Sequence, residues 1–129
     1  MSDLQIKDSG ERSVYESGAQ RDNWIGKGRF DLMSAQGLLR LARWYELGSE
    51  KYAPRNWEKG MNVSRYVDAA MRHLIKYMCG CDDEDHLSAV AWNVFAIMYH
   101  EVEKPEMQDL PGRKDRRTKW IYDIDLGNK

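Results

Sequence analysis

The chain lacks the features that mark several large protein classes. It has only two cysteines in 129 residues, Cys79 and Cys81, which excludes a cysteine-based zinc finger and a disulfide framework. The longest apolar run, residues 89–99, is interrupted by Asn93 and is too short to span a bilayer. The N-terminus is polar and carries no secretory signal. We therefore expect a cytoplasmic protein, of a cell or an infected cell, with no membrane partner.

Excess charge of one sign is also missing. The 20 Lys and Arg residues nearly balance the 21 Asp and Glu residues, for a net charge of −1, so no overall field favours nucleic acid. We expect no nucleic-acid partner. Aromatic residues, in contrast, are plentiful: five Trp and seven Tyr exceed what so small a core needs, which places some of them on binding or subunit surfaces.

Strand patterns are nearly absent, whereas three segments have amphipathic helical periodicity. The first runs from about Ser34, a plausible N-cap, to Lys51, and Pro54 stops it. The second starts after Asn62 or Ser64 and ends near Gly80. The third starts within residues 82–85 and ends near Lys104. The pattern predicts an all-α protein.

The chain divides by composition into three parts. Residues 1–33 form a polar, glycine-containing arm that we expect to be irregular and to contribute to the site, and residues 34–104 form the helical core. Residues 105–129 form a polar tail with a basic run at 113–119 and a short anchoring element at 120–124. Three amphipathic helices bury little by themselves, so we expect oligomerisation to complete the bundle, through the apolar sides of the second and third helices.

The most informative stretch is residues 46–60, behind the first helical pattern. Glu46 and Glu50 lie one turn apart on the same side of a helix and can hold a hard divalent cation. Nearby cations can hold phosphate, and Trp57 can stack on a base. The alternative is a solvated face on which the two glutamates pair with Arg43 and Lys51.

A second acidic cluster, residues 82–85, precedes the third helix. Asp82 and Asp85 lie one turn apart and could be further metal ligands. Capping of the helix and complementation of its dipole explain the same acids without a metal. The sequence leaves both explanations open.

Two histidines lie near these acids. His73 borders the apolar stripe of the second helix, where a core role competes with a ligand role, and His86 can contact a carboxylate or a phosphate. Together with Asp85 they raise the idea of an HD-type phosphohydrolase with a transition metal. The order Asp-His and the lack of a further His/Asp pair argue against it.

Five motifs occur in order along the chain, at residues 17–22, 26–32, 48–52 with 56–60, 72–73 and 85–93. This ordered set resembles the phage-encoded dATP/dGTP diphosphohydrolase family, which is similar to the MazG-type all-α NTP pyrophosphohydrolases. The similarity covers about residues 17–103.

The resemblance implies an all-α fold, an obligate oligomer (a dimer or dimer of dimers) and Mg²⁺ or Mn²⁺. It implies hydrolysis of purine deoxynucleoside triphosphates to monophosphate and pyrophosphate, in the host cytoplasm if the chain is phage-encoded. The broader superfamily holds metal with ExxE and ExxD, where this chain has Glu46-xxx-Glu50 and Asp82-xx-Asp85.

We therefore predict that Glu46, Glu50 and Asp85 are catalytic metal ligands, with Asp82 as a further ligand. The predicted substrate-binding residues are Lys27, Arg29, Lys51, Arg55, Asn56, Trp57, Arg72, His73, His86 and Asn93. Two alternatives stay open: a phage nucleotide-binding protein without turnover, such as a sponge for a signalling nucleotide, and a purely structural helical subunit.

Overall fold

The computed structural model describes residues 4–120 of the chain. These belong to two compact units, one within residues 1–33 and one within residues 34–129, and each unit is described by itself. Of the predicted anchoring element at residues 120–124, only Trp120 falls within the described range, and its side chain is exposed.

The first unit contains a small hairpin where the sequence indicated no strand. Strands β1 (Arg12–Val14) and β2 (Gln20–Asp22) pair antiparallel, with Arg12 opposite Asp22. Asp22 accepts hydrogen bonds from the backbone of Ser9 (3.2 Å) and from Lys27 (3.0 Å). Our expectation of an irregular arm is corrected here: strands of three residues, held by backbone pairing and polar side chains, carry no apolar alternation to reveal them.

The second unit holds the three predicted helices, which the structure confirms: α1 (Ala35–Lys51), α2 (Val63–Met78) and α3 (His86–Glu103). A short 3₁₀ turn, η2 (Asn56–Lys59), lies between α1 and α2, and a second one, η3 (Pro105–Met107), follows α3. The Ser34 hydroxyl caps α1 by accepting from the Gly37 backbone at 3.0 Å. Within residues 4–120, no helix is long and apolar enough to cross a membrane.

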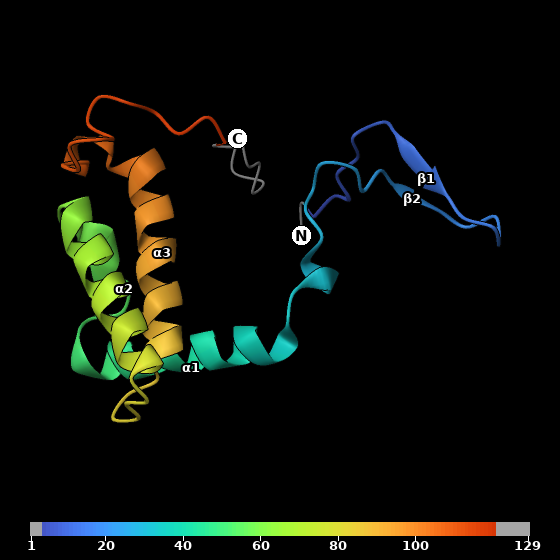
Figure 1. The fold of residues 1–129 in the computed structure, drawn as a ribbon. Helices are drawn as coiled ribbons and strands as arrows, with labels where there is room; N and C mark the ends of the chain where they lie inside the picture. The colour runs from blue at the N-terminus through green and yellow to red at the C-terminus, as the bar shows by residue number, and fades with distance from the viewer. Residues whose placement is uncertain (1–3, 121–129) are drawn as a thin grey trace. The chain divides into compact units, whose positions relative to one another are not determined.

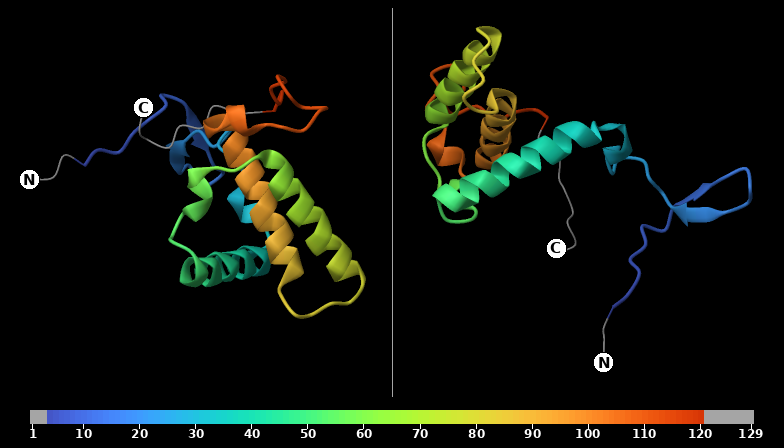
Figure 2. Two further views of the ribbon diagram at one scale, coloured as in Figure 1. Left: turned by 90° about the vertical axis from the view of Figure 1, so that its left-hand side faces the viewer. Right: turned by 90° about the horizontal axis from the view of Figure 1, so that it is seen from below.

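Helices α2 and α3 lie side by side and run in opposite directions, and α1 lies across them near the α2–α3 turn (Figure 1 and Figure 2). The Tyr66 side chain packs against Trp92 and His100, with ring centroids 5.9 and 4.8 Å apart. Asp109, after η3, accepts from the backbone and the hydroxyl of Ser64 at 2.8 and 2.6 Å. The first turn of α2 is therefore capped from 45 residues away.

The face of α3 that one chain buries is small and polar. It consists of His86, Ala89, Asn93, Ala96 and His100, at helical spacing. His100 is fully buried; its Nδ1 donates to the Ala96 carbonyl and its Nε2 accepts from the Met61 backbone.

The apolar side of the same helix stays exposed in one chain. Its members are 37–57% exposed: Val94, Phe95, Met98 and Val102. On α2, Met71, Leu74 and Met78 are also exposed. Burial of such side chains normally stabilises a protein, but the described part of one chain leaves these ones exposed to water.

Candidate functional site

The two glutamates of α1 lie on the solvent side of their helix. Glu46 is exposed and forms an ion pair with Arg43, with Nη1 and Oε2 2.7 Å apart. Glu50 is exposed in the last turn of the helix, next to Lys51. In one chain this geometry matches the solvated-face alternative, with the Arg43 pair that the sequence suggested.

The loop after α1 places cationic and aromatic side chains close together. Arg55 adopts a left-handed backbone conformation (φ 60°), which is uncommon for a residue other than glycine. Its guanidinium pairs with Glu58 and lies 5.1 Å from the centre of the Trp57 ring. Trp57 meets Tyr99 of α3 edge-on at 4.9 Å, and both Asn56 and Trp57 are half-buried. The loop therefore joins the predicted phosphate and base contacts to α3.

Asp85 is the N-cap of α3 and is already well hydrogen-bonded. It accepts from the backbone and the hydroxyl of Ser88 at 3.2 and 2.8 Å, and from two nitrogens of Arg40 at 2.7 and 3.2 Å. The bond from Arg40 is the main reason that the pKa of Asp85 lies below its usual value. Sequence reasoning missed Arg40, because it is 45 residues from Asp85 and only the packing of α1 on α3 joins them.

The most closely grouped donor atoms lie at the turn between α2 and α3. The Nδ1 atoms of His73 and His86 are 2.9 Å apart, and Glu84 places a carboxylate oxygen 3.9 Å from His73 Nδ1. His86 is 2% exposed, and its Nε2 lies 2.8 Å from the carboxylate of Asp83. Partial burial is the main reason that the pKa of His73 is lowered, which favours the neutral ring.

The sequence indicated the two histidines, the acidic cluster at residues 82–85 and a carboxylate contact of His86, but it did not pair Asp83 with His86 or Glu84 with His73. Asp83 lies only three residues before His86, in the turn that leads into α3, so a contact between them could have been expected from the sequence. The spacing between His73 and Glu84 gave no such indication, because the turn between the helices decides whether they meet.

The four carboxylates predicted to bind metal do not form such a group. Across residues 4–120, only His73, Glu84 and His86 bring three metal-binding atoms within 4.8 Å of one another. Asp82 is exposed in the turn, while Glu46 and Asp85 are engaged by arginines. One chain therefore does not present the cluster of oxygen ligands that Mg²⁺ prefers.

The remaining predicted contacts of the second unit have local partners. Arg72 pairs with Asp68 on α2 at 2.5 Å, one helical turn away at i,i+4 spacing. Asn93 is buried and donates to the Ala89 carbonyl at 2.7 Å. Lys51 extends over the Tyr52 ring, with its nitrogen 5.3 Å from the ring centre. Of these, Arg72 and Lys51 are accessible to an anion.

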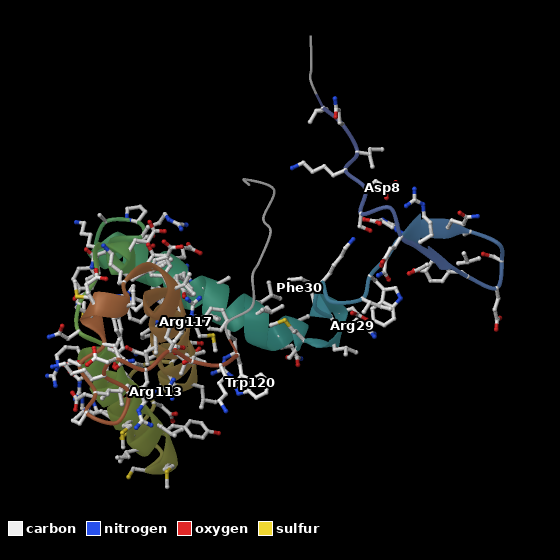
Figure 3. The ribbon with its side chains drawn as sticks, turned by 90° about the horizontal axis from the view of Figure 1, so that it is seen from above. Asp8, Arg29, Phe30, Arg113, Arg117 and Trp120 are labelled. Carbon is white, nitrogen blue, oxygen red and sulfur yellow. The ribbon has the colours of Figure 1, made fainter. Side chains whose placement is uncertain are left out.

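The two predicted phosphate contacts of the first unit are held by acids of that unit. Lys27 bonds Asp22, and Arg29 forms two bonds to Asp31 at 2.8 and 2.9 Å. Arg29 also lies 5.6 Å from the Trp24 ring centre, beside Phe30 at the short 3₁₀ turn (Figure 3). Both cations remain about half exposed, so a phosphate would have to compete with these carboxylates.

A cavity of about 380 Å³ lies elsewhere, between the end of α3 and the segment after η3. Its lining includes Glu101, Arg113 and Arg117, and none of the predicted site residues. Figure 3 marks Arg113 and Arg117 on this segment. Thr118 and Arg113 both contact Glu101, so the basic run is partly neutralised by α3.

Comparison with known proteins gives one match. The model of the family described as dATP/dGTP diphosphohydrolase, N-terminal, matches residues 17–110. No curated protein and no solved structure matches the chain. The matched range spans all three helices and about half of the first unit, and it contains every residue predicted for the site. The chain therefore belongs to the dATP/dGTP diphosphohydrolase N-terminal family.

Proposed function

We propose that this chain hydrolyses dATP or dGTP between the α- and β-phosphates, giving the deoxynucleoside monophosphate and pyrophosphate. The observation that carries the proposal is the family match over residues 17–110. The description of that family supplies the substrate pair and the class of hydrolase, and the bond cleaved is our inference.

The loop after α1 supports this reaction by its chemistry. A triphosphate is densely negative, and an arginine grips it through two parallel hydrogen bonds while a lysine acts as a point charge. We propose that Arg55 and Lys51 bind the triphosphate, with Lys27, Arg29 and Arg72 as further contacts. When it binds the departing phosphates, Arg55 would exchange its pair with Glu58 for a more highly charged partner.

The base side of the site is proposed at Asn56 and Trp57. An indole face stacks on a purine, and an amide can donate to and accept from the edge of a base. The edge-on contact with Tyr99 and the nearby Arg55 fix the Trp57 ring. A fixed ring loses less conformational entropy when a base binds to it.

We also propose dependence on Mg²⁺ or Mn²⁺, which would neutralise triphosphate charge. The proposed ligands are Glu46, Glu50 and Asp85, with Asp82. Because one chain does not gather them, a second copy or the substrate itself must complete the set. Metal binding by these carboxylates thus depends on assembly more strongly than the sequence indicated.

The assembly proposed is a symmetric dimer or dimer of dimers, in the manner of MazG-type enzymes. The exposed apolar sides of α2 and α3, with Leu74, Phe95 and Met98 among them, support it. Light scattering should give a mass of two or four chains at micromolar concentration. A stable monomer of 15.1 kDa would contradict this part of the proposal.

The test of function is a substrate panel. The pure protein is incubated with each canonical dNTP and NTP, with Mg²⁺ and with Mn²⁺, and pyrophosphate is measured. We expect release from dATP or dGTP, dependent on the divalent ion. No release from any nucleotide with either ion would refute the proposal.

The alternative is a nucleotide-binding protein without turnover. The separation of the four carboxylates within one chain favours it, because a sponge needs cationic and aromatic contacts but no cluster of oxygen ligands. Tight nucleotide binding in the presence of a chelator, without pyrophosphate release when metal is added, would establish this alternative.

A further inference from the structure

The turn between α2 and α3 brings together a set of donor atoms to which the proposed reaction assigns no metal ion, although two of the residues, His73 and His86, are also predicted substrate contacts. The set comes from His73 in the last turns of α2, Glu84 in the turn and His86 at the first position of α3 (Figure 1). All three ligand atoms lie within 4.8 Å of one another. We propose that His73, Glu84 and His86 bind a transition-metal ion of the Zn²⁺ class, at a site distinct from the predicted Mg²⁺ carboxylates.

The hydrogen bond behind His86 orients this ring as a ligand. The Asp83 carboxylate, 2.8 Å from Nε2, can only accept a hydrogen bond when ionised, so Nε2 carries the hydrogen. A neutral ring then has its lone pair on Nδ1, which points toward His73. A carboxylate behind a histidine ligand is the arrangement that fixes the tautomer in many metal sites.

The distance between the two rings suits a shared ion. Two nitrogen ligands at about 2.0–2.1 Å from a tetrahedral ion lie about 3.3 Å apart, and the two Nδ1 atoms are 2.9 Å apart. Metal binding thus needs the rings to separate by only a few tenths of an ångström. The competing arrangement is a hydrogen bond from His73 Nδ1 to His86 Nδ1 without a metal, and the experiment below distinguishes the two.

The donor types select the ion. Two imidazole nitrogens and one carboxylate oxygen suit Zn²⁺, Co²⁺ or Ni²⁺ better than Mg²⁺, which prefers oxygen and octahedral geometry. Three protein ligands leave a fourth tetrahedral position open to water. His86 is buried, whereas the Glu84 side chain is 45% exposed, so the group can be reached from solvent on the Glu84 side of the turn.

Two exposed thiols in the same turn, Cys79 and Cys81, are the main competing zinc ligands. They do not belong to the group of donor atoms above. A Cys79→Ser/Cys81→Ser variant therefore serves as the background for the test, because it removes thiol binding and keeps the proposed ligands.

The experiment uses chelator-treated, desalted full-length protein. Zn²⁺ is titrated calorimetrically, and Co²⁺ is titrated by the visible absorption of tetrahedral cobalt. In the double serine background we expect one ion per chain, not displaced by excess Mg²⁺. Glu84→Gln and His73→Gln should each weaken binding by at least about 100-fold, and Asp83→Asn by about 10- to 100-fold, as for other partners that orient a ligand.

The control is Glu103→Gln, a similar change at an exposed acid near the end of α3, which should leave the affinity unchanged. The exposed position of Glu84 keeps its variant informative even if His73→Gln unfolds. The proposal is overturned if the serine background binds no stoichiometric Zn²⁺ or Co²⁺, or if Glu84→Gln binds as tightly as its parent. Both readouts are independent of nucleotide hydrolysis, so this result and the substrate panel can fail separately.

Discussion

The acidic end of α1 and the turn between α2 and α3 contain similar residue types but differ in how they are held. At the end of α1, Glu46 and Glu50 point to solvent and have at most a neighbouring cation as partner. At the turn, His86 is buried and bonded on both ring nitrogens. A ligand group already formed in one chain needs only its ion, whereas exposed carboxylates need substrate, metal or a second chain to become ordered.

The largest effect is expected when the charge of Glu50 is removed. Glu50→Gln should keep the fold, since the side chain is exposed, and should lower the rate of pyrophosphate release by about 100-fold or more. An amide cannot supply the charge that holds a hard cation. The measurement is turnover of dATP and dGTP at limiting Mg²⁺, with Glu103→Gln as control. Wild-type turnover in Glu50→Gln would assign the α1 glutamates to a solvated face.

The second test separates what one chain builds from what assembly builds. Met98→Asp puts a charge on the exposed apolar side of α3, and burying it at an interface without a partner costs several kcal/mol. Light scattering should show the assembly dissociating to monomers, with loss of hydrolysis but retention of Zn²⁺ binding at the turn. An unchanged mass would place the subunit contact elsewhere.

Lys51 gives a smaller effect of a different kind. Lys51→Ala removes one charged contact to the triphosphate, worth roughly 1.5–3 kcal/mol. We expect KM to rise at least about tenfold, with metal binding unchanged. Steady-state kinetics checks this against Lys119→Ala, at the exposed last position of the basic run. Equal KM values in both variants would remove Lys51 from the site.

A substitution at the start of α1 should change the stability of the protein but not its activity. Ser34→Ala removes the hydroxyl that accepts from Gly37 and should lower the free energy of unfolding by about 1 kcal/mol, with KM unchanged. The matched control is Ser49→Ala in the same helix, whose hydroxyl only donates to the Glu46 carbonyl. Denaturant unfolding should show little or no loss there, and an equal loss in both variants would contradict the capping role.

Asp109 provides a reference carboxylate with a purely structural role. Hydrogen bonds from Ser64 hold its pKa below the usual 3.8. A carboxyl group whose pKa is lowered by folding adds stability at pH values above its ordinary, unfolded-state pKa. This added stability is lost as the pH falls through the lower pKa of the folded state. The melting temperature of Asp109→Asn should therefore lie slightly below wild type at pH 7, and the difference should shrink below about pH 4. A gap that is constant with pH would contradict this role.

The sequence predicted the helices well because each carries its own periodicity and ends. Ser34 and Pro54 bracket α1, and Asp85 begins α3 as a cap, one of the two roles that the sequence left open. The hairpin was missed because its three-residue strands are polar, and the cap of α2 because Asp109 is supplied from a distant loop.

The sequence predicted which residue types form the candidate site, but not how they are arranged in space. A charge-rich stretch such as residues 46–60 indicates a binding or catalytic site from its own composition. The meeting of His73 with Glu84, or of Arg40 with Asp85, depends on the turn angle and on helix packing, which local periodicity does not specify. The residues of the site could therefore be predicted from the sequence more easily than the distant residues that they contact.

The identity of the products tests most directly whether the protein cleaves the α–β phosphoanhydride bond of a purine dNTP. Following dGTP and dATP by ³¹P NMR with the protein and Mg²⁺ or Mn²⁺ distinguishes the possible bonds in a single experiment. We predict equal amounts of monophosphate and pyrophosphate. Diphosphate with inorganic phosphate, or intact triphosphate with free deoxynucleoside, would contradict it.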